Sequence, residues 1–266
     1  MKNGIKVTIL GCSSSGGVPR LGTDWGDCDP AEPKNARNRC SILVEKQGPD
    51  GLTSVVIDTG PDFRQQMLRA NVQRLDAVLY THSHADHLHG IDDLRMFYMI
   101  NKAEIPVYMD TPTFARAQEA FGYCFKRPEG SSYPPILRRV PITASKEFAV
   151  EGPGGAIHFQ PFEVEHGNIP ALGFRFNDVC YLPDVSQIGA NELPFVEDLD
   201  VWIIDCLRRR PHPTHFHLEM ALDWIEKMKP KSAVLTNLHN DLDYQTLAAE
   251  TADHIAPAYD GMTLEI

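Results

Sequence analysis

One short segment carries an unusual density of side chains that bind metal ions: Thr81-His82-Ser83-His84-Ala85-Asp86-His87. It follows directly after the strand-like run Ala77–Thr81. In a loop that leaves a strand, His82 and His84 can converge on one ion while Asp86 and His87 face a second ion about 3.5–4 Å away. Imidazole and carboxylate groups suit Zn²⁺, Mn²⁺ or iron better than metals that prefer thiolates. The segment predicts a site for two divalent metal ions, with a polar helix cap as the alternative.

Three further residues of ligand type lie just past apolar, strand-like runs: His166, Asp184 and His239. A single residue of this kind is more often a surface residue than a metal ligand. Because all three follow the ends of strands, however, they can meet at the same edge of a sheet. Asp184 is expected to bridge the two ions. The predicted ligands are therefore His82, His84, Asp86, His87, His166, Asp184 and His239.

The elements that position these residues are mainly short runs rich in Val and Ile, bounded by Gly, Pro or Asp. The predicted strands are Ile5–Leu10, Ser41–Glu45, Ser54–Asp58, Ala77–Thr81, Pro106–Met109, Phe148–Val150, Ile157–Val164, Leu172–Phe176, Val179–Leu182, Val201–Ile204 and Ala233–Thr236. Helical spacing predicts Asp62–Ala70, Asp92–Met99, a helix led by Thr111-Pro112, and Leu218–Met228.

Two segments do not fit this regular pattern. The long polar loop Cys12–Arg39 is interpreted either as a functional, ligand-covering loop or as a mobile surface loop. The segment Ile105–Arg139 is expected to be a short insertion that can wall a pocket. No linker or low-complexity tract divides the chain, so residues 1–266 are predicted to form one domain.

Composition excludes several classes of protein. Of the 266 residues, 42% are hydrophobic and 23% are charged, which is ordinary for a globular chain. Twenty-five Lys and Arg against 36 Asp and Glu give a net charge of −11, which argues against non-specific duplex binding. No apolar run approaches the roughly 20 residues of a membrane span, and the chain starts without a leader pattern, so a cytoplasmic location is expected. The six cysteines form no CxxC pair and are interpreted as reduced packing residues.

The order of motifs resembles that of the metallo-β-lactamase superfamily: a strand, Ile57-Asp58-Thr59-Gly60, the HxHxDH segment, then His166, Asp184 and His239. The resemblance covers essentially the whole chain. It implies an α/β fold, a four-layer αβ/βα sandwich with the metals at one edge of two sheets. It also implies that Asp58 orients the histidine loop from outside the metal shell.

Within that superfamily, the start Ile9–Pro19 and the segment Thr214–Leu218 are similar to the subgroup of the tRNA 3′-end endonucleases and the phosphodiesterase accessory to carbon–phosphorus lyase. This resemblance places His215 near a scissile phosphate.

The sequence departs from this subgroup at two places. Cys28 is the one thiol where the accessory phosphodiesterase has a zinc-binding cysteine cluster, so that structural zinc is not expected. The subgroup's last histidine ligand falls on Asn237, and His239, expected on the same strand face, is the available substitute.

The predicted function is hydrolysis of small phosphodiesters, such as 2′,3′-cyclic nucleotides or ribose cyclic phosphates, by a hydroxide that bridges two ions. The catalytic residues are His215 as general acid, with Asp86 and Asp184 on the metals. Predicted substrate-binding residues are Ser13, Ser14, Ser15, Arg209 and His217, of which His217 is also the alternative proton donor.

The expected partners follow from size and charge. A small phosphodiester or nucleotide is the expected substrate, with no membrane, no stable nucleic-acid complex and a possible homodimer. Two alternatives stay open: a thioesterase or lactonase of the same fold, which would not need His215, and a nucleotide-binding relative with little turnover.

Overall fold

The computed structural model describes residues 4–266 and contains two seven-stranded sheets. The first has the order β14 (Thr263–Glu265), β1 (Ile5–Gly11), β2 (Ser41–Gly48), β3 (Gly51–Ile57), β4 (Ala77–Leu79), β5 (Ile105–Met109), β6 (Leu137–Pro141). The second has the order β13 (Ile255–Pro257), β12 (Ser232–Thr236), β11 (Val201–Asp205), β10 (Val179–Leu182), β9 (Ile169–Phe176), β8 (Ile157–His166), β7 (Phe148–Val150).

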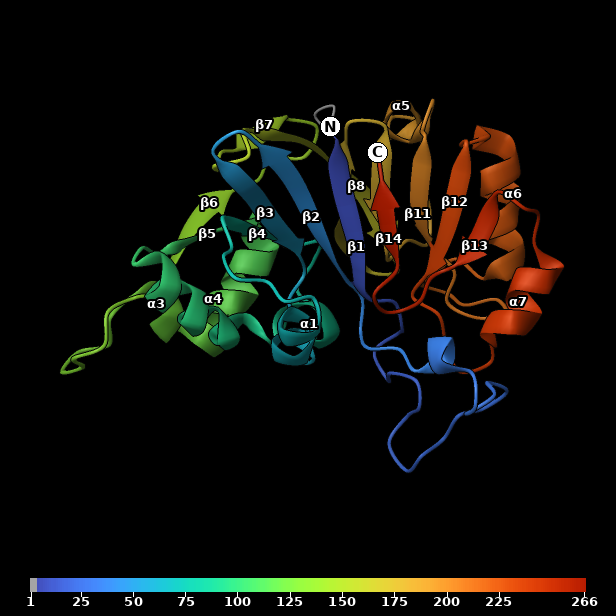
Figure 1. Ribbon diagram of the computed structural model, residues 1–266, viewed down its shortest axis with the longest axis horizontal. Helices are drawn as coiled ribbons and strands as arrows, with labels where there is room; N and C mark the ends of the chain where they lie inside the picture. Colours follow the sequence, from blue (N-terminus) through green and yellow to red (C-terminus); the bar gives the residue numbers. More distant parts are fainter. Residues whose placement is uncertain (1–3) are drawn as a thin grey trace.

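Helices cover the outer face of each sheet (Figure 1). The first sheet carries α1 (Phe63–Arg69), α2 (Ala85–Leu88), η2 (Ile91–Leu94), α3 (Arg95–Asn101) and α4 (Thr111–Phe125). The second carries α5 (Leu193–Val196), α6 (Leu218–Met228) and α7 (Tyr244–Glu250). The remaining short helix, η1 (Pro33–Asn35), lies between β1 and β2. The predicted α/β sandwich of four layers is confirmed.

Three apolar clusters hold these layers together. Val7 and Ile57 of the first sheet pack with Phe174 and Ile203 of the second between the sheets. The alternate side chains point outward, so that Val56 packs under the helices of the first sheet, in a cluster with Phe63 of α1. A similar cluster lies under the helices of the second sheet. Because both faces of each sheet are covered, the central strands are apolar throughout, and no simple alternation is visible in their sequence.

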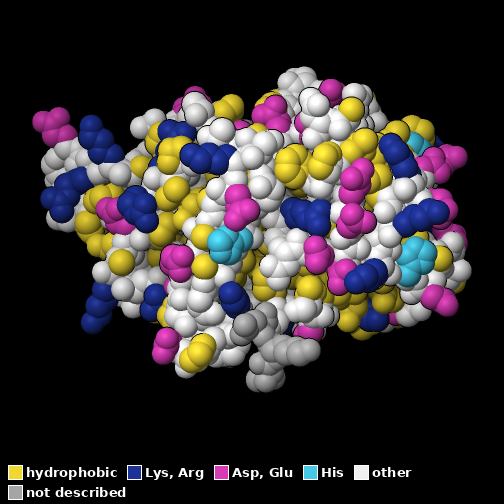
Figure 2. Space-filling view, turned by 90° about the horizontal axis from the view of Figure 1, so that it is seen from above, with side chains coloured by type: hydrophobic (Ala, Val, Ile, Leu, Met, Phe, Trp, Pro, Cys, Tyr) yellow, Lys and Arg dark blue, Asp and Glu magenta, His cyan; other side chains and the backbone are white. Residues whose placement is uncertain are grey.

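The predicted ligands lie at one edge of the sandwich because several strands end there. Strands β3 to β6 run parallel to one another, as do β10 to β13. The loops that follow β4, β10, β11 and β12 carry polar residues, and in open α/β sheets such loops at the carboxyl ends of strands form ligand sites. The edge with the two chain termini lies opposite, and Figure 2 shows Lys and Arg side chains interspersed there with Asp and Glu.

The segment Ile105–Arg139 differs from the expected insertion. Its β5 and β6 are paired strands of the first sheet, joined by α4. The sequence did not reveal β6 because Arg138 and Arg139 interrupt its apolar pattern. The predicted helix Asp92–Met99 is divided into η2 and α3.

The loop between β1 and β2 protrudes from one edge of the sandwich (Figure 1, blue) and is attached to the rest of the molecule by hydrogen bonds. Asn35 and Arg37 in this loop are buried. The Asn35 side-chain amide donates to Asp243 at 2.6 Å, and Arg37 Nη2 donates to the carbonyl of Leu242 at 2.8 Å. These contacts argue against the interpretation as a mobile surface loop.

The composition led to expectations about the cysteines and about membrane-spanning segments, and residues 4–266 bear on both. All six cysteines are free and buried, as expected for packing residues. None of the described helices is both long enough and apolar enough to cross a membrane.

Candidate metal centre

The histidine segment after β4 brings its side chains into a compact cluster with residues from the second sheet. Ligand atoms of His82, His84 and His166 all lie within 4.8 Å of one another, as do those of His82, His87 and Asp184. His166 Nε2 is 3.2 Å from His84 Nδ1, and His87 Nε2 is 3.1 Å from Asp184 Oδ2. Two sets of donors therefore share His82 and lie side by side.

Asp86 borders the second set. Its carboxylate oxygen is 3.6 Å from His87 Nε2. Together, the structure brings six of the seven predicted ligands into contact with at least one other predicted ligand: His82, His84, Asp86, His87, His166 and Asp184.

Each buried histidine of the cluster is oriented by its other ring nitrogen. His87 Nδ1 lies 2.8 Å from Asp58, His166 Nδ1 lies 2.8 Å from the carbonyl of Thr214, and His82 Nδ1 lies 3.0 Å from the Thr81 hydroxyl. Such contacts fix the ring and leave Nε2 for an ion. Asp58 is fully buried and also accepts from the backbone and hydroxyl of Thr81, so it braces the whole histidine loop.

The donor atoms fit a divalent ion. His82 Nε2 is buried and lacks a hydrogen-bond partner within residues 4–266, which is a costly arrangement unless another group binds it. Burial lowers the pKa of His82 well below its usual range, so its ring is neutral and keeps a lone pair for a metal. Nitrogen and carboxylate donors of this kind suit Zn²⁺ or Mn²⁺.

Two residues are candidates for the last predicted ligand position, Asn237 and His239. The expectation that both lie on one strand face is wrong, because β12 ends at Thr236 and Asn237 has a positive φ of 62°. The Asn237 amide donates to Asp205 at 3.0 Å. His239 Nδ1 is 3.4 Å from Asp241, and its Nε2 contacts the guanidinium of Arg20. The Asp241 carboxylate thus lies on the Nδ1 side of the His239 ring, but His239 Nδ1 has no hydrogen-bond partner within residues 4–266.

His215 adjoins the cluster and is held by a residue that the sequence did not single out. Its Nδ1 is 2.9 Å from Asp205 and 3.5 Å from Asp184. Burial alone would lower the pKa of His215, but the carboxylates of Asp205 and Asp184 outweigh it and raise the pKa to about 9. Asp205 is the last residue of β11, and its position directly after the apolar run Val201–Ile204 was the available signal.

These residues open into one cavity of about 450 Å³. Its wall contains Ser14, Ser15, Arg20, His84, Ala85, Asp86, His166, Asp184, Leu207, Arg208, His212, Thr214, His215, Asn237 and His239. The predicted substrate-binding Ser14 and Ser15 are therefore at the cavity. Ser13 is buried beside them, and its hydroxyl donates to the Ser14 carbonyl.

Besides Ser13, two predicted substrate-binding residues lie outside the cavity wall, Arg209 and His217. The Arg209 guanidinium forms an ion pair with Glu250 at 2.8 Å, and its Nε donates to the carbonyl of Asp241. His217 precedes α6, with its Nε2 3.9 Å from Glu219. Arg208 lines the wall where Arg209 was expected, because successive side chains of an extended loop point in different directions, and Arg20 reaches the wall from the loop between β1 and β2.

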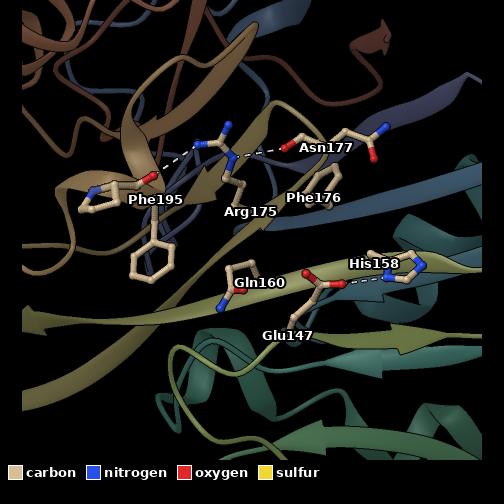
Figure 3. Close-up of a pocket in the computed structure, with 8 residues that line it drawn as sticks. Glu147, His158, Gln160, Arg175, Phe176, Asn177 and Phe195 are labelled. Carbon is tan, nitrogen blue, oxygen red and sulfur yellow. Dashed lines mark hydrogen bonds and ion pairs between the residues drawn. The ribbon is translucent and has the colours of Figure 1, made fainter.

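A second hollow, of about 320 Å³, lies beside β7, β8 and β9 (Figure 3). Its ionic groups are satisfied locally. Glu147 and His158 are 2.8 Å apart, and Arg175 Nη1 donates to the carbonyl of Glu197 at 2.7 Å. Unlike the histidine cluster, this hollow has no group of closely spaced metal-binding atoms without hydrogen-bond partners among its lining residues.

Comparisons with known proteins agree with this architecture. Residues 53–237 match the family described as the beta-lactamase superfamily domain. A crystal structure of a diphosphatase from the PhnP family superposes with a TM-score of 0.88 at 33% identity, covering 99% of this chain and 97% of that one. Human tRNase Z, short form, superposes with a TM-score of 0.64 at 16% identity over 97% of this chain and 98% of that one.

A curated relative is similar in sequence over nearly the whole chain. An octanoyltransferase of Porphyromonas gingivalis (strain ATCC BAA-308 / W83) is 31% identical over 262 residues, which is 97% of this chain and 51% of the relative. The chain therefore spans about half the length of that relative. From the sandwich, the HxHxDH cluster at its edge and the family match over residues 53–237, we conclude that the chain belongs to the β-lactamase superfamily.

Proposed function

We propose that the protein is a metal-dependent hydrolase of phosphoester bonds in small anionic molecules. The observation that carries the proposal is the Asp205–His215 pair, whose histidine lines the same cavity as His84, His166 and Asp184. A hydrolase needs a proton donor for its leaving group beside its metal ligands, and this pair supplies a histidine with a fixed ring. The similarity to a diphosphatase supports phosphoryl chemistry.

The donor sets define which residues would hold the ions. His82, His84 and His166 would hold one ion, and Asp86 and His87, with the predicted ligand His239, would hold the other. Asp184 lies within reach of both groups, 3.1 Å from His87 and 3.9 Å from His166. When bound, two divalent ions lower the pKa of water and neutralise charge on phosphoryl oxygens. Asp58 keeps the histidine loop fixed while the substrate is turned over.

His215 would move the proton. Its Nδ1 is committed to Asp205, so Nε2, on the other side of the ring, is the atom that gives a proton to the leaving oxygen. The raised pKa of about 9 means that the ring carries this proton at neutral pH in the ion-free protein. A positioned general acid contributes roughly 10²–10⁴-fold to a rate.

The cavity supports a small substrate. Its volume of about 450 Å³ is within the range of roughly 300–1,000 Å³ typical of small-molecule sites. A net charge of −11 disfavours a long polyanion such as tRNA. Cyclic nucleotides with a 2′,3′-phosphate and ribose cyclic phosphates fit both conditions.

A second candidate is hydrolysis of a thioester or another acyl bond. It is favoured by the similarity to a relative named octanoyltransferase over 97% of this chain. Acyl hydrolysis would use the same metal ligands but would not require His215 to protonate an alkoxide.

The test is a substrate panel with the metal-analysed protein: bis-p-nitrophenyl phosphate, 2′,3′-cyclic nucleotides, an octanoyl thioester and a lactone. Wild type should cleave the phosphodiesters, Asp184→Ala should abolish turnover, and His215→Ala should lower kcat by at least about tenfold with its metal content intact. His158→Ala, in the separate hollow beside β7, is the matched control. Cleavage of the thioester or lactone alone, unaffected by His215→Ala, would reject the phosphoester proposal in favour of acyl chemistry.

A further inference from the structure

The loop between β1 and β2 presents a fixed arm to the cavity. Val18 and Arg37 exchange backbone hydrogen bonds of 3.0 and 2.8 Å across the arm. Arg37 in turn holds the carbonyl of Leu242, and the backbone amide of Asp27 donates to the carbonyl of Asn240. The arm is therefore attached at several points to the chain that follows β12, and a side chain on it has a defined position.

Arg20 is placed toward the cavity by a tight turn in this arm. The backbones of Arg20 and Asp24 pair through hydrogen bonds of 2.9 and 3.3 Å, and Gly22, with a φ of +83°, helps to close the turn. Leu21 is 99% exposed, whereas the Arg20 side chain lines the cavity. Gly16 leaves room for it, since a Cβ there would lie 3.3 Å from Arg20 Cγ and Nε.

The charge of Arg20 has no carboxylate partner within 4 Å in the described chain. Arg208, in the same cavity wall, also lacks one, because its Nε and Nη2 donate to the carbonyls of Arg210 and Pro211. Neighbouring arginines are paired instead: Arg39 with Asp62 and Arg209 with Glu250. In a chain of net charge −11, two arginines without carboxylate partners at one cavity indicate an anion site.

Arg20 lies directly beside one of the predicted metal ligands. Its guanidinium contacts His239 Nε2, the same nitrogen that would bind an ion. One nitrogen cannot face both groups, so with an ion at His239 the guanidinium would be free to bind another acceptor. Ser14 and Ser15 line the wall with it and can add hydrogen bonds to an anion.

We infer that Arg20, with Arg208, binds a second phosphoryl group beside the one that is attacked, and that the preferred substrates are therefore diphosphates rather than single phosphodiesters. This inference rests on the proposed function and extends it from phosphoester bonds to the phosphoanhydride bond of a diphosphate. Water adds its oxygen to one phosphorus, the bridging P–O bond breaks, and the leaving phosphate takes a proton from His215. The products are two monophosphates, and no other reactant is needed.

The test compares two probes with the metal-loaded protein: ADP-ribose, which contains a diphosphate, and bis-p-nitrophenyl phosphate, which has one phosphoryl group. Arg20→Ala should raise KM for ADP-ribose and weaken inhibition by inorganic pyrophosphate by roughly 10- to 100-fold, the range for lost hydrogen bonds to charged groups. It should change kcat/KM for bis-p-nitrophenyl phosphate by less than about threefold. Arg208→Ala should act in the same direction, and Arg20→Lys should restore part of the loss.

Arg210→Ala is the control, because Arg210 has the same charge in the same loop but is exposed and lies outside the cavity wall. Equal losses on both probes, or no loss on ADP-ribose and pyrophosphate, would overturn the inference. Thermal melting and metal analysis of each variant exclude unfolding as the cause. If wild type cleaves neither probe, calorimetry with pyrophosphate still decides: binding that depends on Arg20 rejects the proposed activity but keeps the anion site, and binding that does not depend on Arg20 rejects both.

Discussion

His215 Nδ1 and Asp205 Oδ2 lie 2.9 Å apart, and the Asp205 side chain is fully buried at the end of β11. Asp205 also accepts hydrogen bonds from the backbone of Val185 and the amide of Asn237. The carboxylate is therefore fixed by three segments of the chain, and it fixes the imidazole in turn. Asp205 is a positioning residue for His215.

Asp205→Asn should lower kcat by about 10- to 100-fold, because an amide does not stabilise the imidazolium and orients the ring less firmly. Metal content should remain at the wild-type level. Steady-state kinetics of Asp205→Asn, His215→Ala and the double variant check the coupling: if the two residues act as one unit, the double variant is no slower than His215→Ala. Losses that multiply in the double variant would show that Asp205 acts independently of His215.

Metal stoichiometry distinguishes the two residues at the last ligand position. His239→Ala should reduce the bound metal from two ions per chain to about one, because His239 lines the cavity and the Asp241 carboxylate lies on the Nδ1 side of its ring, which leaves Nε2 for an ion. Asn237→Ala should keep two ions, since the Asn237 amide is already engaged with Asp205.

Elemental analysis after dialysis, together with titration of metal into stripped protein, measures this difference without relying on activity. The opposite result, with one ion lost in Asn237→Ala and none in His239→Ala, would assign the ligand to Asn237.

Asp260 should make the stability depend on pH. Burial raises its pKa from 3.8 to about 6, against the opposing effect of Arg69 at 3.0 Å. The folded protein thus holds the Asp260 proton more tightly than the unfolded chain. The resulting stabilisation is fully present below pH 3.8 and is lost as the pH rises through about 6.

Asp260→Asn has no such titration. The free energy of unfolding of wild type minus that of Asp260→Asn should fall by about 2 kcal/mol between roughly pH 4.5 and pH 7. Urea unfolding of both proteins in EDTA at the two pH values gives this difference, in which the other titrating groups cancel. A difference that stays constant with pH would mean that Asp260 is ionised at both values.

The sequence alone was sufficient for the histidine segment and for most of the sheet. Four ligand-type residues within six positions of one loop are a local signal, because neighbours in sequence are also neighbours in space. The strands Phe148–Val150 and Val179–Leu182 and the helix Leu218–Met228 have the predicted bounds. The edge strands β6, β13 and β14 were missed, because they are short and two of them carry charged residues.

Tertiary structure decided which charged residues reach the cavity. Arg209 lies in the one triple-basic run of the chain, yet Glu250 of α7 binds it outside the wall, while Arg20 reaches the cavity from a turn 189 positions earlier in the sequence. Asp205 belongs to the site because the parallel strands β10 and β11 end side by side, which brings Asp184 and His215 next to it. Residue types and spacing determine which ions can bind, whereas contacts between distant segments determine which side chains face them, because those contacts depend on how the two sheets pack.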